Sequence, residues 1–289
     1  MRRDVIPWVE SIEAVRQAVD EARARGLTIG LVPTMGALHE GHVHLIERCR
    51  AEADFVVVSI FVNPTQFGPS EDFTRYPRTP ELDRDRAAAG GADLIFAPTA
   101  EAMYPHGQES TCIDVLPFSG IFEGAIRPGH FRGVATVVLK LFSIVGPDLA
   151  CFGKKDFQQQ CVIRRMAEDL NLRLSIQIVE TVREPDGLAL SSRNRYLDPD
   201  QRRGALVLRR ALENARTAVA GGVRDAERVR QILHDTINSE PMAQLDYAEV
   251  VDAETLGVLT VLGADRTAVA LLAVRFGATR LIDNAFLPE

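Results

Sequence analysis

Short apolar runs alternate with amphipathic segments through the N-terminal part of the chain. The runs Leu27–Pro33 and Phe55–Val62 are continuously apolar, which is the pattern of strands buried on both faces of a parallel sheet. Strand–helix–strand units of this length form right-handed parallel crossovers, so the pattern predicts an α/β, Rossmann-like doubly wound parallel sheet. We expect the strands at Leu27–Pro33, Phe55–Val62, Asp93–Ala97, Leu149–Gly153 and Leu174–Val182, with a further one at Thr111–Val115.

Helical periodicity fills the intervals between these runs. Ser11 is expected to cap the first helix and Gly26 to end it. Residues 67–80 show neither helical nor strand periodicity and are rich in proline. A connection of that length is usually functional or disordered, and we expect it to act as a lid. The helices are expected at Ser11–Arg25, His42–Ala53, Glu81–Ala89, Ala135–Val145 and Asp156–Leu170.

The pattern changes after Asp198. Two charged amphipathic helices are expected over Pro199–Ala220 and Arg224–Asn238, separated by two glycines. Closely spaced strands follow near Leu245–Val251, Ala268–Arg275 and Thr279–Asn284. This order predicts a second, smaller α+β domain, so we divide the chain into residues 1–182 and residues 183–289.

Composition limits the classes of function. The formal net charge of −7 argues against a nucleic-acid binder that works through bulk electrostatics. No apolar run is long enough to span a membrane, and no apolar stretch follows the N-terminal arginines. We therefore expect a cytoplasmic protein with no membrane partner. The cysteines lack C-x-x-C spacing, which favours reduced, mostly buried thiols over disulfides or a zinc site: Cys49, Cys112, Cys151 and Cys161.

The main candidate for chemistry is Thr28–Leu45, which reads TIGLVPTMGALHEGHVHL. A strand that runs through a glycine-containing turn into a helix presents N–H groups and a positive dipole end, which together favour phosphate. His39 and His42 could be a metal pair, but the H-E-x-x-H spacing of zinc proteases is absent. We favour neutral imidazoles that donate to phosphate oxygens, with a surface position as the alternative. His44 is expected to be a packing or surface residue.

A second candidate is Phe152–Asp156, where a strand ends in two lysines. This position lies on the ligand-binding edge of an open α/β sheet, and a lysine there supplies a point charge for phosphate. Only one of Lys154 and Lys155 can face the ligand. Asp156 is equally suited to capping the next helix and to accepting from a ribose hydroxyl.

Weaker candidates lie on irregular segments and strand ends. Ser191, Ser192 and Arg193 could clamp a phosphate near the expected domain boundary. Gln66 follows a buried strand, and Gln159 lies one turn into a helix. Either glutamine could bind a carboxylate-bearing substrate or simply face solvent.

Taken together, these segments have a recognisable order and spacing. PTMGALHEGH, VSIFVNPTQF, YPRT, GHFRGV, FGKKDFQQ and REPDGLALSSRNRYL closely resemble the pantoate–β-alanine ligase (pantothenate synthetase) family. That family shares a HIGH-like motif with class I aminoacyl-tRNA synthetases and cytidylyltransferases. The resemblance covers roughly residues 28–200.

The resemblance implies an activity and a site. ATP and (R)-pantoate would form pantoyl adenylate, which β-alanine would convert to pantothenate, with AMP and diphosphate as the other products; the enzyme would be a homodimer. His42, in the family's proton-donor position, His39 and Lys155 would be catalytic. Gln66 and Gln159 would bind pantoate, with Gln66 also serving β-alanine and His130 and Arg127 lying near that pocket. ATP would contact Met35, Gly36, Ala37, Leu38, His39, Glu40, Gly41, His42, Gly153, Lys154, Lys155, Asp156, Val182, Leu190, Ser191, Ser192 and Arg193.

The sequence departs from the family pattern at two places. Leu190 stands where relatives often carry Met. Relatives also carry adjacent acidic residues after YPRT that are associated with Mg²⁺, and here Leu82 leaves Asp83 alone. Asp83 is the one candidate metal ligand, and we expect Mg²⁺ to be held mainly by ATP phosphates and water.

Two other interpretations remain open on the residues themselves. A nucleotidyltransferase that stops at adenylyl or cytidylyl transfer would release diphosphate without needing β-alanine. A non-catalytic ATP-binding regulator would bind ATP but release no diphosphate with any acid.

Overall fold

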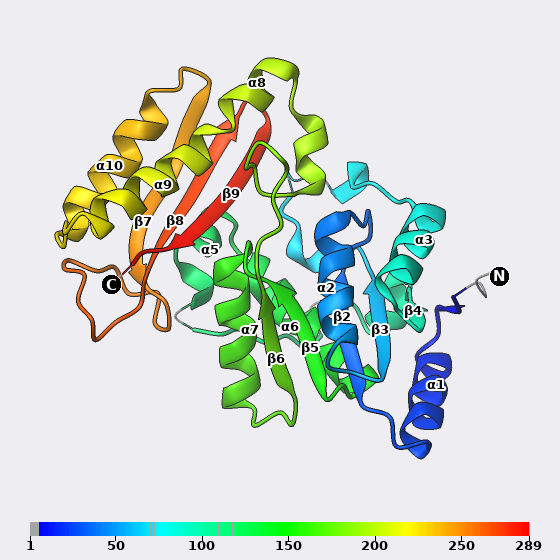
Figure 1. The fold of residues 1–289 in the computed structure, drawn as a ribbon. Coiled ribbons are helices and arrows are strands. Elements are labelled where there is room, and N and C mark those ends of the chain that lie inside the picture. Colours follow the sequence, from blue (N-terminus) through cyan, green and yellow to red (C-terminus); the bar gives the residue numbers. More distant parts are fainter. Residues whose placement is uncertain (1–5, 70, 72, 109, 117, 289) are drawn as a thin grey trace. The chain divides into compact units, whose positions relative to one another are not determined.

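A parallel sheet of six strands, in the order β1-β4-β3-β2-β5-β6, forms the centre of the N-terminal part of the chain (Figure 1). The structure is a computed structural model that describes residues 6–69, 71, 73–108, 110–116 and 118–288. The strands are β1 (Trp8–Val9), β2 (Ile29–Thr34), β3 (Phe55–Ile60), β4 (Leu94–Phe96), β5 (Leu149–Gly153) and β6 (Ser175–Val179). All described pairings in this sheet are parallel, as the apolar runs predict.

The chain divides into two compact units, which we describe separately. The first comprises Met1–Lys154 and Gln158–Glu180, and the second comprises Lys155–Phe157 and Thr181–Glu289. The three residues Lys155–Phe157, which follow β5 in the sequence, thus group with the C-terminal part of the chain.

The order of the strands reverses between β2 and β5, which are neighbours in the sheet. Ligands of open α/β sheets bind at such a switch point, beyond the carboxyl ends of the strands. The turn that begins at Met35 and the segment that begins at Lys154 both leave the sheet there.

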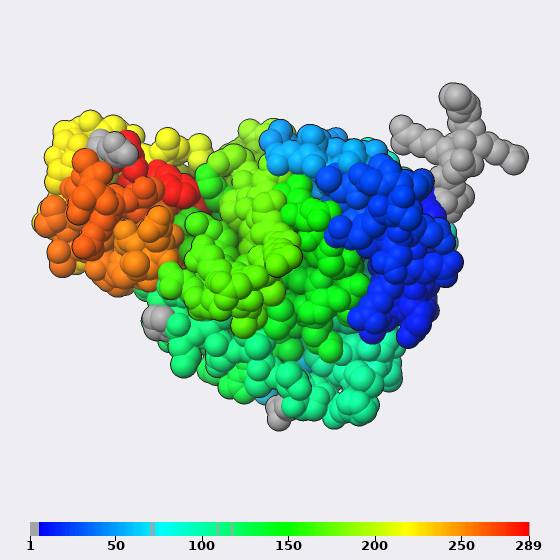
Figure 2. All heavy atoms as spheres, turned by 90° about the horizontal axis from the view of Figure 1, so that it is seen from below, coloured from blue at the N-terminus to red at the C-terminus, as the bar shows by residue number. Residues whose placement is uncertain are grey.

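Helices cover both faces of this sheet. Val32 and Val58 pack in an apolar cluster with Ile46 of α2, whereas Leu31 and Val57, which point to the opposite face, are also fully buried. In Figure 2 the dark-blue α1 segment lies on the surface of this unit. The helices are α1 (Ile12–Ala24), α2 (Glu40–Arg50), α3 (Pro80–Gly90), α4 (Ala100–Met103), α5 (Glu123–Ile126), α6 (His130–Val145) and α7 (Phe157–Asp169), with 3-10 helices η1 (Pro64–Gln66), η2 (Phe73–Arg75) and η3 (Phe118–Gly120).

Three local expectations for this unit are wrong. Thr111–Val115 forms no strand; the N–H of Ile113 donates to a side chain, the Thr136 hydroxyl of α6, at 2.9 Å. Helix α6 begins at His130 rather than at Ala135, after Gly129 in the left-handed conformation. Helix α2 begins at Glu40 rather than at His42, so His39 is its N-cap.

The second unit contains a three-stranded antiparallel sheet, in the order β7-β8-β9, and helices that pack on it. This confirms the predicted α+β character. Its elements are η4 (Ser192–Tyr196), α8 (Pro199–Gly204), α9 (Val207–Ala220), α10 (Ala226–Asn238), β7 (Ala243–Asp252), β8 (Ala268–Phe276) and β9 (Thr279–Phe286).

The helix expected over Pro199–Ala220 is interrupted at Ala205 and Leu206. Both residues keep right-handed helical dihedral angles. The N–H of Leu206 donates three residues back, to the Arg203 carbonyl at 3.3 Å, so one tightened turn separates α8 from α9.

Candidate active site

The turn between β2 and α2 has an unusual backbone. Gly36 and Ala37 both have positive φ, at 78° and 49°. A Cβ on Gly36 would lie 2.9 Å from Ile60 Cγ2 and 3.0 Å from an oxygen of Asp83. Glycine is therefore required at position 36, both by the conformation and by the space.

Asp83 of α3 holds this turn in place. Its side chain is 1% exposed, and its carboxylate accepts from the Ala37 N–H at 3.0 Å and from the Leu38 N–H at 2.7 Å. The Thr79 hydroxyl donates to the same carboxylate at 3.1 Å. A buried carboxylate with this many donors is well satisfied, and its position is that of a structural anchor for the turn.

His39 and His42 cap helix α2 reciprocally. Nδ1 of His39 accepts from the Gly41 N–H, and Nδ1 of His42 accepts from the His39 N–H, both at 3.2 Å. The ring centroids are 4.1 Å apart. Because each Nδ1 accepts from a backbone N–H, the neutral tautomer of each ring carries its proton on Nε2.

The backbone of this turn is thus engaged within the protein. Gly36 N–H donates to the Thr34 hydroxyl at 3.1 Å, and the N–H groups of Ala37, Leu38, His39 and Gly41 have the partners described above. The expectation that open N–H groups here form the phosphate site is wrong for these residues. The donors that suit an anion at this turn are the Nε2–H groups of the imidazoles.

Gln66 lies at the end of η1 and is 9% exposed. Asn63, which the sequence analysis did not select, donates to the Gln66 Oε1 at 3.1 Å and to the Gly133 carbonyl at 3.2 Å. Tyr104 donates to the Oδ1 of Asn63 at 2.8 Å. The Gln66 amide in turn lies 3.2 Å from the sulfur of Met35, so two predicted site residues from different segments meet.

The position of Asn63 could have indicated its role. An Asn followed by Pro directly after a buried strand lies at the ligand-binding edge of the sheet. Tyr104 carries no comparable signal, because it reaches Asn63 only through the fold.

His130 and Arg127 lie against the backbone of Gln66. His130 Nδ1 is 2.9 Å from the Gln66 carbonyl, and Arg127 Nη1 is 3.0 Å from His130 Nε2. Since a guanidinium only donates, Nε2 accepts and Nδ1 carries the proton. Burial, together with the charge of Arg127, lowers the pKa of His130 to about 4, so this imidazole is neutral near pH 7.

Arg127 also binds Glu71 of the predicted lid. Two hydrogen bonds of 2.6 Å join the guanidinium to both carboxylate oxygens. Burial raises the pKa of Glu71, but the hydrogen bonds and charge of Arg127 outweigh it and hold that pKa below its usual range. The lid positions Ser70 and Asp72 lie outside the described residues.

The two lysines after β5 have different surroundings. Lys154 forms an ion pair with Glu180, and its N–H donates to the Val179 carbonyl at 2.8 Å. Lys155 Nζ lies 3.8 Å from Asp156 Oδ1. Gly153 ends β5. These contacts agree with the selection of Lys155 over Lys154 as the phosphate-binding lysine, a selection that stays a prediction.

Gln159 lies on α7 with its side chain partly exposed. Its neighbour Gln158 is 4% exposed and holds η3 and α5, by donating to the carbonyls of Phe118 and Ile121, each at 2.8 Å. The structural role on this helix thus falls to Gln158, which leaves Gln159 available for a ligand.

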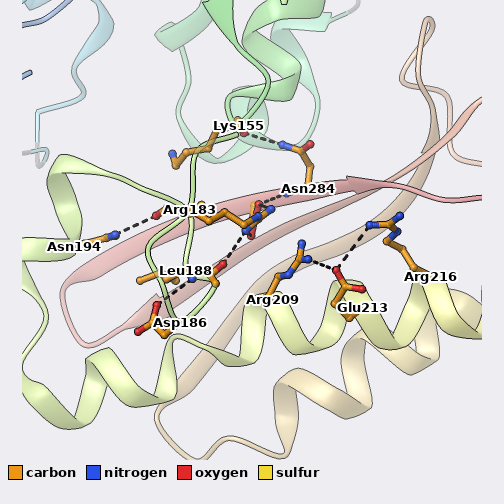
Figure 3. Close-up of polar contacts among 12 residues, drawn as sticks. Lys155, Arg183, Asp186, Leu188, Asn194, Arg209, Glu213, Arg216 and Asn284 are labelled. Carbon is orange, nitrogen blue, oxygen red and sulfur yellow. Dashed lines mark hydrogen bonds and ion pairs between the residues drawn. The ribbon is translucent and has the colours of Figure 1, made fainter. Parts of the chain in front are cut away.

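The second unit places the remaining predicted ATP residues on one hairpin and the turn after it. Leu190 N–H donates to the Val182 carbonyl at 3.0 Å, and Ser191 Oγ caps η4 by accepting from the Arg193 N–H at 3.3 Å. Ser192 and Arg193 begin η4. Figure 3 shows this hairpin, through Arg183 and Leu188, beside strand β9.

The described residues contain no group of three or more His, Cys, Asp or Glu side chains that could hold a metal ion. Asp83 is the predicted metal ligand, and its carboxylate accepts from the Ala37 and Leu38 N–H groups of the turn, so a metal role for it stays a prediction. In the same part of the chain, no helix is long and apolar enough to cross a membrane.

Comparison with known proteins bears on these residues as a set. A model of the Pantoate-beta-alanine ligase family matches residues 7–286. The chain belongs to this family. It is 55% identical to the pantothenate synthetase of Pelotomaculum thermopropionicum over 96% of this chain and 98% of that protein. It is 54% identical to that of Moorella thermoacetica, over 96% and 98% of the two chains.

Solved structures of the family agree with the fold. The pantothenate synthetase of Thermus thermophilus matches with a TM-score of 0.92 and 45% identity, covering 98% of this chain and all (100%) of that one. A pantoate–β-alanine ligase from Francisella tularensis, solved with β,γ-ATP and β-alanine, matches with a TM-score of 0.79 and 33% identity over 97% of each chain.

Proposed function

We propose that this chain condenses (R)-pantoate with β-alanine at the expense of ATP, giving pantothenate, AMP and diphosphate. The observation that carries the proposal is the family match over residues 7–286. The HEGH turn, the two glutamines, the paired lysines and the SSR segment all lie within that span.

The first step is adenylation. A pantoate carboxylate oxygen attacks the α-phosphorus of ATP, a new P–O bond forms, and the bond to the diphosphate oxygen breaks. Negative charge builds on the leaving diphosphate, which departs as an anion. Donors already aimed at that charge stabilise the transition state more than the ground state.

His39 and His42 supply such donors through Nε2–H. Protonating either ring at Nδ1 would break a capping hydrogen bond of α2. We therefore assign both rings as neutral hydrogen-bond donors to the phosphates. This makes His42 a stabiliser of charge rather than an acid that transfers its proton.

In the second step the β-alanine amine attacks the acyl carbon of pantoyl adenylate. The C–N bond forms, the bond to the AMP oxygen breaks, and the amine loses a proton. We propose that Gln66 and Gln159 bind pantoate, with Asn63 fixing the orientation of Gln66. The neutral His130 holds the Gln66 carbonyl, so the pantoate pocket is preorganised.

We propose that Lys155, Asp156 and Ser191–Arg193 contact ATP as well. Lys155 would neutralise phosphate charge, and Arg193 would add donors. These residues belong to the C-terminal unit, which we expect to close over the nucleotide and exclude water from the hydrolysable adenylate.

Mg²⁺ is proposed to enter with ATP, held by phosphate oxygens and water. The engaged oxygens of Asp83 support this assignment. Assembly as a homodimer and a cytoplasmic location are proposed from family membership, and sedimentation and cell fractionation test them.

A coupled assay tests the activity. AMP should accumulate only when ATP, pantoate and β-alanine are all present, in a 1:1 ratio to pantothenate. Continuous diphosphate release without β-alanine, with the adenylyl group kept in the product, would support a nucleotidyltransferase instead. ATP binding without diphosphate release for any acid would support a regulator.

A further inference from the structure

Strand β9 carries two adjacent buried polar residues that the proposed mechanism does not use. Asp283 is 3% exposed and Asn284 is 5% exposed. Successive side chains on a strand point to opposite faces, so one buried polar residue on each side of β9 needs its own set of partners.

Asn284 is bonded to the residue that carries the proposed phosphate-binding ammonium group. Its Nδ2 donates to the Lys155 carbonyl at 2.9 Å, as Figure 3 shows. Two residues further along each segment there is a second contact. The rings of Phe157 and Phe286 meet edge to face, with their centroids 5.7 Å apart. These contacts explain why Lys155–Phe157 groups with the C-terminal unit.

Asp283 is bonded to the second proposed ATP segment. Its carboxylate accepts from both terminal nitrogens of Arg183, at 2.7 and 3.0 Å. Arg183 Nη1 also donates to the Gly187 carbonyl at 3.1 Å. Arg183 thereby ties β9 to the turn of the hairpin that leads into Leu190 and Ser191.

A single strand thus fixes the backbone of both segments. The side chains that would contact ATP in these segments are placed only as well as their backbones are held, and the long side chain of Lys155 depends on this most. A bidentate Arg–carboxylate pair and a buried amide–carbonyl hydrogen bond give directional restraint at both points.

We propose that Asp283 and Asn284 are positioning residues for ATP: Asn284 acts through Lys155, and Asp283 acts through Arg183 and the hairpin. The proposal rests on the proposed function of these segments. Neither residue is expected to touch the nucleotide.

The test measures ATP binding by calorimetry on the full chain with ATP and Mg²⁺ but no pantoate. Asn284→Ala should raise the Kd for ATP about 5- to 20-fold. Asn284→Asp, which keeps the shape but loses the donor, should do the same. Asn214→Ala is the matched control, because Asn214 donates to the Thr236 hydroxyl at an exposed position of the same unit. The Kd of this variant for ATP should equal that of the wild type.

Asp283→Asn has its own control in Asp246→Asn. Asp246 of β7 accepts from Arg275 and Arg280 at 3.0 and 2.6 Å, so it holds an ion-pair cluster in the same sheet whose partners belong to β8 and β9 and not to either segment. Both substitutions should lower the thermal stability of this unit. Only Asp283→Asn should raise the Kd for ATP.

A double-mutant cycle distinguishes positioning from general destabilisation. In a Lys155→Ala background, Asn284→Ala should raise the Kd by less than about twofold, because the group it positions is already gone. An unchanged Kd in Asn284→Ala, a full additional loss in the Lys155→Ala background, or equal losses in Asp246→Asn and Asp283→Asn would overturn the proposal. A wild-type chain that bound ATP but formed no AMP would refute the proposed reaction and leave this test intact.

Discussion

At the scale of single residues, the HEGH turn combines two functions in one pair of side chains. The Nδ1 atoms of His39 and His42 cap helix α2, and the Nε2 edges are proposed to act on phosphate. An N-cap hydrogen bond contributes about 1 kcal/mol, whereas a preorganised donor to a developing charge contributes about 3 kcal/mol to catalysis. Substitutions that separate the two nitrogens should therefore separate stability from rate.

His42→Asn makes that separation. The Asn oxygen can replace Nδ1 as acceptor for the His39 N–H, but nothing replaces Nε2. Adenylation should fall about 100- to 1000-fold with an unchanged melting temperature, whereas His42→Ala should lose both rate and stability. Diphosphate release kinetics and thermal unfolding check this, and a near-normal rate in His42→Asn would remove Nε2 from the mechanism.

Substitution of Asp83 distinguishes a role in anchoring the turn from a role in binding a metal ion. Asp83→Asn removes the charge that two backbone N–H groups share, and each such bond contributes about 1.5–3 kcal/mol. The variant should be destabilised by about 2–4 kcal/mol and should lose adenylation rate, with an unchanged half-saturating Mg²⁺ concentration. Asp85→Asn, at an exposed position of the same helix, should match the wild type, and a large rise in the Mg²⁺ requirement of Asp83→Asn alone would make Asp83 a ligand.

The low pKa of His130 predicts that the free energy of unfolding decreases at acid pH. The native pKa of about 4 lies below the ordinary value of 6.5, so the unfolded chain binds this proton first. The contribution of the neutral His130 to the free energy of unfolding is complete above pH 6.5 and is lost as the pH falls toward 4. The loss is about 3 kcal/mol, because each unit of pKa difference corresponds to about 1.36 kcal/mol. Urea unfolding between pH 4 and 7 should show a shallower pH dependence in His130→Gln, and parallel curves would contradict the assignment.

At the scale of elements, the segment from Phe67 to Pro80 is anchored at Glu71 by Arg127. Aromatic contacts support it, because Phe67 packs against Phe73 and Tyr76 with centroids 5.4 and 6.0 Å apart. An ion pair and a small aromatic cluster thus hold this segment within its unit.

Glu71→Gln should make this segment more sensitive to chymotrypsin, because the charge that binds Arg127 is lost. If the segment acts as a lid, adding ATP and pantoate should slow its cleavage by chymotrypsin in the wild type. Glu81→Gln, at an exposed position of α3, serves as the control. Equal cleavage of all three chains, with and without substrates, would refute both the anchor and the lid.

The apolar runs predicted β2 to β5, because burial leaves a local signal, and a run at Leu174–Val182 predicted β6. The two-residue strand β1 was missed. The same reasoning failed at Thr111–Val115, where the N–H of Ile113 donates to the Thr136 side chain of α6 and not to a neighbouring strand. It also placed the start of α2 two residues late, because histidine is an uncommon N-cap and the reciprocal bonds of His39 and His42 cannot be inferred from residue type.

The site residues also divide into those with a local signal in the sequence and those without one. Segments at strand ends, such as Met35–His42, could be found from their position after a buried run. Their supporting partners could not, because Asp83 and Asn284 reach the site segments only across the fold. Sequence spacing carries no record of such contacts.

At the scale of the whole molecule, each of the two units carries a different part of the proposed site residues. The N-terminal unit carries the HEGH turn and the pantoate glutamines, and the C-terminal unit carries Lys155 and the hairpin that leads into Ser191–Arg193.

An oxygen-transfer experiment tests the central claim, that pantoate is activated as an acyl adenylate. Pantoate labelled with ¹⁸O in both carboxylate oxygens is turned over with ATP and β-alanine, and the products are analysed by mass spectrometry. Acyl adenylation predicts one ¹⁸O in AMP, one in the amide of pantothenate and none in diphosphate. Unlabelled AMP, or label in diphosphate or inorganic phosphate, would contradict it.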